Sequence, residues 1–117
     1  MSLKFGHQAV EKEPGMLELR PNCECCDKDL PPDAIDARIC SYECTFCADC
    51  VDNVLSNVCP NCGAGFVPRP IRPRKEWRPG VGLTKQPAST ERRKLKYDRA
   101  DIAAFVTLVR DTRPEER

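Results

Sequence analysis

The segment that decides the fold is PNCECCDKDLPPDAIDARICSYECTFCADCVDNVLSNVCPNCG, residues 21–63. It holds all nine cysteines of a chain of 117 residues. Eight of them form four close pairs with the spacing Cys23-x2-Cys26-x13-Cys40-x3-Cys44-x2-Cys47-x2-Cys50-x8-Cys59-x2-Cys62. So short a segment cannot bury enough apolar surface to fold on its own core, because domains below roughly 70 residues usually need a cross-link. Disulfides or metal ions must therefore hold it together.

Three features favour metal over disulfides. The first residues contain no apolar run typical of a secretory signal, so we expect a cytoplasmic, reducing environment. An odd number of cysteines leaves one thiol unpaired in any all-disulfide scheme. Cysteines separated by two residues are also the usual arrangement of zinc-binding loops. The sequence therefore predicts two structural Zn²⁺ ions per chain, although cysteine tetrads also accept iron.

The order of the pairs indicates which cysteines share an ion. If residues 40–50 formed one helix, its ends would lie about 15 Å apart, too far for a single site. A hairpin with strands at 37–39 and 45–46, followed by a helix from Asp49 to Asn57, separates these pairs instead. This predicts a cross-brace, in which the first pair joins the third and the second joins the fourth. Site one is then Cys23, Cys26, Cys47 and Cys50, and site two is Cys40, Cys44, Cys59 and Cys62.

Parts of this segment resemble known families. The second half of a RING finger is similar to two motifs here, Cys44-x-Phe46-Cys47-x-x-Cys50 and Cys59-Pro60-x-Cys62. RING fingers usually have His where this chain has Cys44. The stretch from Leu17 to Gly63 resembles more closely an uncharacterised bacterial cysteine-rich family, domain of unknown function 1272, and the resemblance covers about residues 16–92. It implies a bacterial zinc-binding module without an assigned reaction. The predicted fold class is a small metal-stabilised α+β domain of the treble-clef or RING-like type.

Composition divides the chain into four parts. Residues 1–15 are polar and contain Pro14-Gly15, which predicts a flexible extension. The two-zinc domain occupies residues 16–67. Residues 68–97 are rich in proline and basic side chains, which predicts an extended, solvated linker. Residues 98–111 form a predicted amphipathic helix, capped by Asp98, with an apolar stripe of Ile102, Phe105, Val106 and Val109.

The predicted C-terminal helix needs a surface to pack on. A helix of this length is marginal by itself in water. We therefore expect it either to dock on the same chain or to form a homodimer through residues 98–110. No stretch reaches the roughly 18 apolar residues of a membrane helix, so no membrane partner is expected.

Charge is distributed unevenly along the chain. Residues 1–63 contain five Lys/Arg and eleven Asp/Glu, whereas residues 64–117 contain fourteen and seven. The basic half is therefore expected to bind something acidic, either nucleic acid or the chain's own acidic half. Trp77 and Tyr97 could stack on bases. The phosphate contacts of a nucleic acid would come from Arg72, Arg74, Lys75, Arg92, Arg93 and Lys94.

Nothing in the sequence indicates catalysis. The single histidine, His7, lies outside the cysteine segment, and sites saturated by four cysteines leave no open position for a substrate. We therefore predict no enzymatic activity and a structural zinc-binding module that interacts with an unknown protein or with nucleic acid.

Two other functions compete with this interpretation. A RING-type E3 ubiquitin-ligase-like protein is disfavoured by Cys25 and Gly63, because RING ligases have an apolar and often a basic residue at these positions. A zinc or redox sensor would use Cys25, the ninth cysteine, as a free thiol. Cys25 is otherwise a small packed residue, or an alternative ligand to Cys23.

Overall fold

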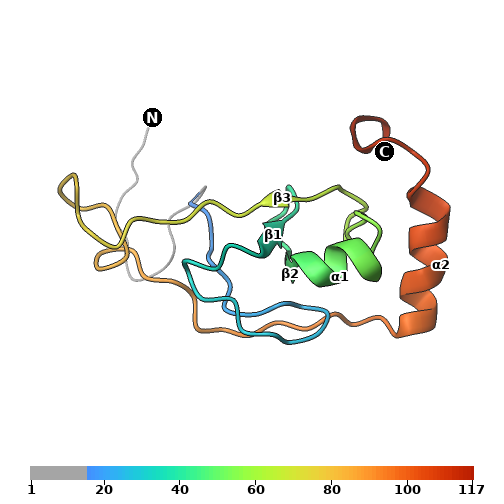
Figure 1. Cartoon of the computed structure of the whole chain (residues 1–117), viewed down its shortest axis with the longest axis horizontal. Helices are drawn as coiled ribbons and strands as arrows, with labels where there is room; N and C mark the ends of the chain where they lie inside the picture. Colours follow the sequence, from blue (N-terminus) through green and yellow to red (C-terminus); the bar gives the residue numbers. More distant parts are fainter. Residues whose placement is uncertain (1–15) are drawn as a thin grey trace.

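The computed structural model describes residues 16–117, which form the predicted small α+β structure (Figure 1). Its elements are β1 (Ala37–Ile39), β2 (Thr45–Cys47), α1 (Ala48–Asn53), β3 (Val67–Pro68), α2 (Arg99–Val109) and the 3₁₀ helix η1 (Pro114–Glu116). The flexible extension predicted for residues 1–15, with His7 in it, lies outside the described residues. Neither α1 nor α2, within residues 16–117, is long and apolar enough to cross a membrane.

A hairpin of β1 and β2 positions the second cysteine pair. The strands pair antiparallel, with Ala37 opposite Cys47. In the turn between them, the N–H of Glu43 donates to the carbonyl of Cys40 (3.0 Å). The hairpin predicted around residues 37–46 is confirmed. The sequence did not indicate β3, which pairs with the other edge of β1 and gives the sheet order β2-β1-β3.

Helix α1 is shorter than the sequence predicts. It begins after Cys47, whose sulfur caps it, and ends at Asn53 rather than at Asn57. Asn57 has a φ of 60°, in the left-handed region, which a right-handed helix cannot accommodate. Its side-chain carbonyl accepts the N–H of Phe66 (2.9 Å). A contact with the chain that leads into β3 therefore replaces the last predicted turn.

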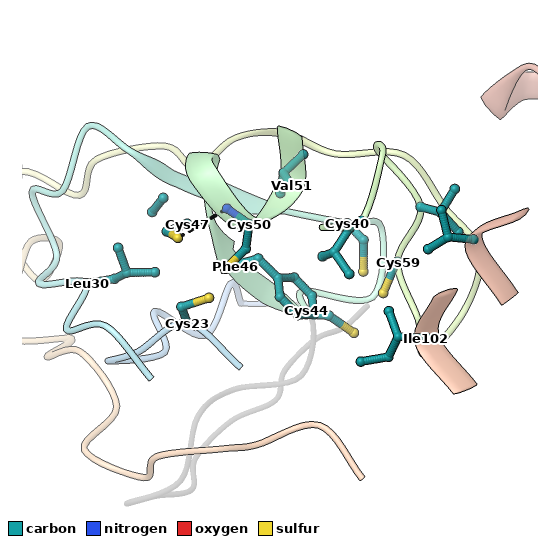
Figure 2. Packing of buried hydrophobic residues seen from close by; sticks show 14 residues of the cluster. Cys23, Leu30, Cys40, Cys44, Phe46, Cys47, Cys50, Val51, Cys59 and Ile102 are labelled. Atoms are coloured by element: carbon teal, nitrogen blue, oxygen red, sulfur yellow. Dashed lines mark hydrogen bonds between the residues drawn. The ribbon is translucent and has the colours of Figure 1, made fainter. Parts of the chain in front are cut away.

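The buried core lies between the sheet, α1 and α2 (Figure 2). Phe46 is fully buried, and its ring meets that of Phe66 edge-on, with 5.3 Å between the ring centroids. Six of the fourteen buried members of the core cluster are cysteines, so few large apolar side chains remain to stabilise it. We therefore expect this core to need metal bound to its sulfurs.

Helix α2 docks its apolar stripe on the cysteine domain. The carboxylate of Asp98 caps the helix by accepting the N–H of Asp101 (2.8 Å), as predicted. Ile102 and Val106 are buried members of the core cluster. Docking on the same chain, one of the two predicted alternatives, is thus observed. A homodimer through residues 98–110 stays a prediction.

Residues 68–97 contain no helix, but they are not a free linker. Arg69 is only 4% exposed. Its guanidinium donates to three backbone carbonyls of the cysteine domain, at 2.8–3.2 Å, which belong to Arg20, Leu30 and Pro31. The prediction of a solvated linker is therefore wrong at its start, because a buried arginine fixes it to the domain.

The end of this region, residues 87–97, also follows the cysteine domain, and we call it the return segment. It runs beside the first described residues (Figure 1). The N–H of Ser89 donates to the carbonyl of Leu19 (3.0 Å), and the N–H of Leu95 donates to that of Glu24 (2.9 Å). The basic half therefore folds back on the acidic half, as one of the two predicted alternatives required.

Candidate metal centre

The first cysteine cluster joins the loop at residues 23–26 to the start of α1. The four sulfurs lie within 4.8 Å of one another, and they belong to Cys23, Cys26, Cys47 and Cys50. The sulfurs of Cys26 and Cys47 are 3.8 Å apart. Four sulfurs in a tetrahedron, each about 2.3 Å from a zinc ion, would be separated by ~3.8 Å. The donor set and its spacing therefore fit zinc.

Backbone N–H groups support the sulfurs of this cluster. The N–H of Cys26 donates to the sulfur of Cys23, and the N–H of Cys50 donates to that of Cys47, both at 3.5 Å. Hydrogen bonds to a thiolate favour its charged form. A spacing of two residues lets the chain turn so that the N–H of the second cysteine faces the sulfur of the first.

The second cluster lies at the turn of the hairpin. The sulfurs of Cys40, Cys44 and Cys59 are within 4.8 Å of one another. Cys62 is exposed, and its sulfur is 3.7 Å from that of Cys40 but is not part of the mutually close set. The 3.7 Å separation again matches the edge of a tetrahedron of about 3.8 Å. Three sulfurs are therefore in place, and the sulfur of Cys62 lies beside one of them.

The structure groups the cysteines as the cross-brace requires, the first pair with the third and the second with the fourth. All nine cysteines are free thiols, so residues 16–117 contain no disulfide. Cys25 is half-buried and belongs to neither cluster, so its position favours a packed or free thiol over an alternative ligand. That the eight sulfurs bind zinc stays a prediction.

The thiols of each cluster shift one another's pKa. Burial raises the pKa of Cys23 to about 11. Hydrogen bonds from Cys44 and Cys59 lower the pKa of Cys40 to about 4, and hydrogen bonds with Cys40 and Cys44 raise the pKa of Cys59. The second cluster thus favours a thiolate at Cys40 and a protonated thiol at Cys59. Because a metal binds thiolates, its binding must displace the remaining protons.

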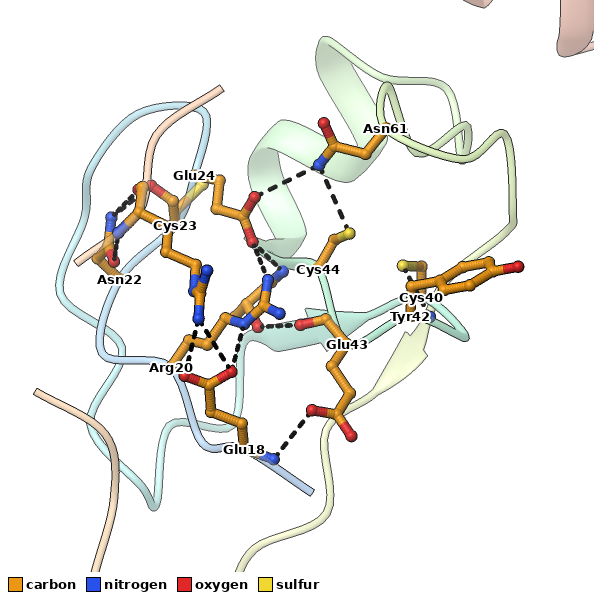
Figure 3. A network of polar contacts seen from close by, with 12 residues as sticks. Glu18, Arg20, Asn22, Cys23, Glu24, Cys40, Tyr42, Glu43, Cys44 and Asn61 are labelled. Atoms are coloured by element: carbon orange, nitrogen blue, oxygen red, sulfur yellow. Dashed lines mark hydrogen bonds and ion pairs between the residues drawn. The ribbon is translucent and has the colours of Figure 1, made fainter. Parts of the chain in front are cut away.

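A buried carboxylate, that of Glu24, lies between the two clusters (Figure 3). Its Oε2 accepts the N–H of Thr45 (2.8 Å) and pairs with the guanidinium of Arg20 (2.9 Å). Its Oε1 accepts from the side-chain amide of Asn61 at 3.4 Å, and that amide also reaches the sulfur of Cys44 at 3.5 Å. A chain of polar contacts therefore connects the first cysteine loop to the second cluster.

The role of Glu24 was not predicted from the sequence. The available signal is its place inside the motif Cys23-Glu24-Cys25-Cys26, where a carboxylate among thiolates is unfavourable unless a cation is paired with it. Arg20, four residues earlier, is that cation, but no regular helix or strand connects the two residues, so periodicity does not indicate the pair.

Two of the arginines proposed as nucleic-acid contacts pair with the chain's own acidic residues. Arg92 donates to Asp27 (2.9 Å) and Asp29 (2.8 Å), and Arg93 donates to Glu18 (3.2 Å). Partial burial alone would raise the pKa of Glu18, but hydrogen bonds from two arginines hold the pKa below its ordinary value. These contacts fix the return segment to the cysteine domain.

The other four candidates differ in their surroundings. Arg72 donates to the backbone carbonyls of Gln86 (2.6 Å) and Leu17 (2.7 Å). The remaining three are exposed and form no ion pair with residues 16–117: Arg74, Lys75 and Lys94. Of the two aromatic candidates, Trp77 is 73% exposed and Tyr97 is 46% exposed. The structure thus separates the basic residues into an engaged group and a free group.

Comparisons with known proteins agree with the family resemblance. The model of a family described as a protein of unknown function, DUF1272, matches residues 16–72, which include both cysteine clusters. An uncharacterized protein of Rhizobium meliloti (strain 1021) is 58% identical over 77 residues, which are 66% of this chain and 84% of that protein. No solved structure matches the chain significantly.

Proposed function

The chain belongs to this family of unknown function, DUF1272, and we propose that it is a structural zinc-binding interaction module without catalytic activity. The observation that carries the proposal is the convergence of eight thiols from four short segments on two clusters, with Cys62 beside the second. The domain has too few large apolar side chains to hold these loops by packing alone. Metal binding would therefore supply most of the stability of the domain.

Zinc is the metal that the geometry supports best. An all-sulfur tetrahedral set suits zinc and iron, and the reducing compartment expected for this chain keeps its thiols available. Four thiolates complete the coordination of zinc and leave no position for water or substrate, which is why catalysis is not proposed.

A treble-clef or RING-like arrangement is the proposed fold type. It is supported by a cysteine loop at residues 23–26, a hairpin of β1 and β2, and a helix α1 that is capped by Cys47 and carries Cys50 in its first turn. A ligase function has less support. Gly63, where RING ligases often carry a basic residue, has a φ of 83°, which disfavours a side chain there.

Metal analysis of the purified full-length chain tests the proposal. We expect two zinc ions per chain by inductively coupled plasma mass spectrometry. Cys26→Ser should lose one of them, because it removes a ligand of the first cluster. Cys25→Ser is the matched control and should keep both, since Cys25 lies in neither cluster. A folded chain without metal, or with iron in both sites, would contradict the zinc proposal.

A further inference from the structure

Residues 73–86 form a loop at the end of the molecule opposite α2 (Figure 1), which we call the basic loop. The guanidinium of Arg72 anchors its base by donating to the carbonyls of Gln86 and Leu17. The first carbonyl belongs to the end of the loop and the second to the start of the cysteine domain. The loop is therefore attached to the domain at a fixed point.

The basic loop is also closed upon itself. The N–H of Leu83 donates to the carbonyl of Pro73 (2.9 Å). Gly82 has a φ of 128°, and a Cβ at this position would lie 3.0 Å from the carbonyl oxygen of Lys75. Only glycine allows this close approach, because any side chain would press on the backbone. The backbone of the loop therefore has a defined shape.

The charge of the basic loop is not neutralised within residues 16–117. Its four cations are exposed and form no ion pair with described residues, and they are Arg74, Lys75, Arg78 and Lys85. The single carboxylate, Glu76, accepts the N–H of Gly80. By contrast, the arginines on both sides of the loop are engaged with the cysteine domain. A net charge of +3 therefore faces solvent here.

Trp77 adds an aromatic surface to this charge. It is the single tryptophan of the chain and is 73% exposed. The ammonium of Lys75 lies 5.4 Å from the centroid of its ring, so a cation covers one face. No other aromatic ring or cation among residues 16–117 contacts the indole, which is largely open to solvent. An aromatic ring with one free face, flanked by cations, is how proteins bind single-stranded nucleic acid without sequence preference.

We propose that the basic loop binds single-stranded nucleic acid, with Trp77 stacking on a base and the loop cations contacting the adjacent phosphates. This inference names the partner of the proposed interaction module and rests on that function, since the metal-bound domain holds the loop at Arg72. A duplex fits less well because its bases are already stacked on one another. An acidic protein or membrane would satisfy the charge but supplies no base to the free face of Trp77.

The fluorescence of Trp77 reports binding directly. The metal-loaded full-length chain is titrated with oligothymidylate and oligouridylate of about twelve nucleotides, within the usual range of site sizes. We expect either strand to quench the fluorescence, and a duplex of the same length to quench it less. Trp77→Ala, followed by anisotropy of a labelled strand, should weaken binding roughly 5- to 150-fold, the loss of one stacked base.

Two triple variants distinguish binding at the basic loop from attraction by positive charge elsewhere on the chain. The first removes loop cations (Arg74→Gln, Lys75→Gln, Arg78→Gln), and the second removes three exposed, unpaired cations elsewhere (Lys96→Gln, Arg99→Gln, Arg110→Gln). Both have the same net charge. In the first variant, the slope of log affinity against log salt concentration should decrease in magnitude by about 2, since each phosphate contact on a single strand contributes about 0.7 to the slope. The second should stay close to wild type.

Several results would overturn the loop proposal. They are the absence of quenching by either strand, equal losses in the two triple variants, and a response to phosphatidylglycerol vesicles or to polyglutamate that exceeds the response to oligonucleotides. Metal content is measured on every sample. A chain with two zinc ions that fails to bind overturns the loop proposal alone. A folded chain that binds without metal supports the loop and contradicts the zinc module.

Discussion

The cysteine domain (residues 16–67) and the C-terminal half (residues 68–117) are ordered by different means. In the first, four short loops converge on two sulfur clusters. In the second, one helix and a few arginines dock on the surface that the first provides, with Ile102 in the shared core and Arg69 on three backbone carbonyls. This difference predicts an order of dependence in folding. The C-terminal half needs a folded cysteine domain, and that domain needs metal.

Removing the metal should have the largest effect and should unfold both regions together. Each filled site would contribute on the order of 10 kcal/mol of apparent folding free energy. We expect a strong zinc chelator to abolish the dispersed amide resonances of both halves, including that of Ile102. Added zinc should restore them, and chelator already saturated with zinc is the control. A chain that stays folded in chelator would show that packing alone orders the cysteine domain.

The next effect should be confined to α2. Ile102→Ala removes a buried side chain from the shared core and should cost about 2–4 kcal/mol of the free energy of unfolding. Zinc content should remain at two per chain. Leu108→Ala, on an exposed position of the same helix, is the control and should change stability by less than about 0.5 kcal/mol. Chemical unfolding at fixed zinc measures both.

The outcome for metal content decides the order of dependence. If Ile102→Ala also released zinc, the C-terminal half would be part of the metal-binding unit rather than a layer added to it. Within the core cluster, Ile102 lies on the side of Cys59 and Cys40 and away from Cys23 and Cys47 (Figure 2), so the second metal site is the one most exposed to this effect. Loss of one zinc ion, with the first cluster still filled, would therefore show that the second cluster needs α2 to bind its metal.

The cysteine domain could be predicted from sequence because its constraints are local. A tetrahedral site needs four sulfurs, and a two-residue spacing places two of them on one turn. The hairpin that carries Cys40 and the helix start at Cys47 follow from separating adjacent pairs. The cap of Asp98 is equally local. The end of α1 was misplaced because Asn57 takes its conformation from a contact with Phe66, which no local pattern contains.

The basic run of the C-terminal half, residues 68–97, could not be predicted in the same way. Arg69 and Arg74 stand in one proline-rich basic run and look alike in the sequence. The first is buried on backbone carbonyls, and the second is free in solvent. What distinguishes them is that β3 pairs with β1 and carries the chain past the carbonyls of residues 20–31. Which basic residues are available to a partner is therefore a property of the tertiary structure.

The smallest effects should distinguish buried from exposed arginines within the C-terminal half. Arg69→Gln leaves three backbone carbonyls without their charged donor, which should cost about 1–3 kcal/mol of the free energy of unfolding. The loss should be insensitive to salt, because the guanidinium is buried and salt screens buried groups weakly. Chemical unfolding at low and high salt, with zinc held constant, measures it.

Arg92→Gln is the exposed counterpart of this variant. Its partners, Asp27 and Asp29, are open to solvent, so its effect should be close to zero and should vanish in high salt. Hydrogen bonding from Arg92 holds the pKa of Asp27 below its ordinary value. The small stabilisation that the ion pair provides is therefore complete at pH 7, and it is lost only as pH falls through that lowered pKa. If Arg92→Gln cost as much as Arg69→Gln in high salt, the C-terminal half would be held by its outer ion pairs as firmly as by its buried arginine.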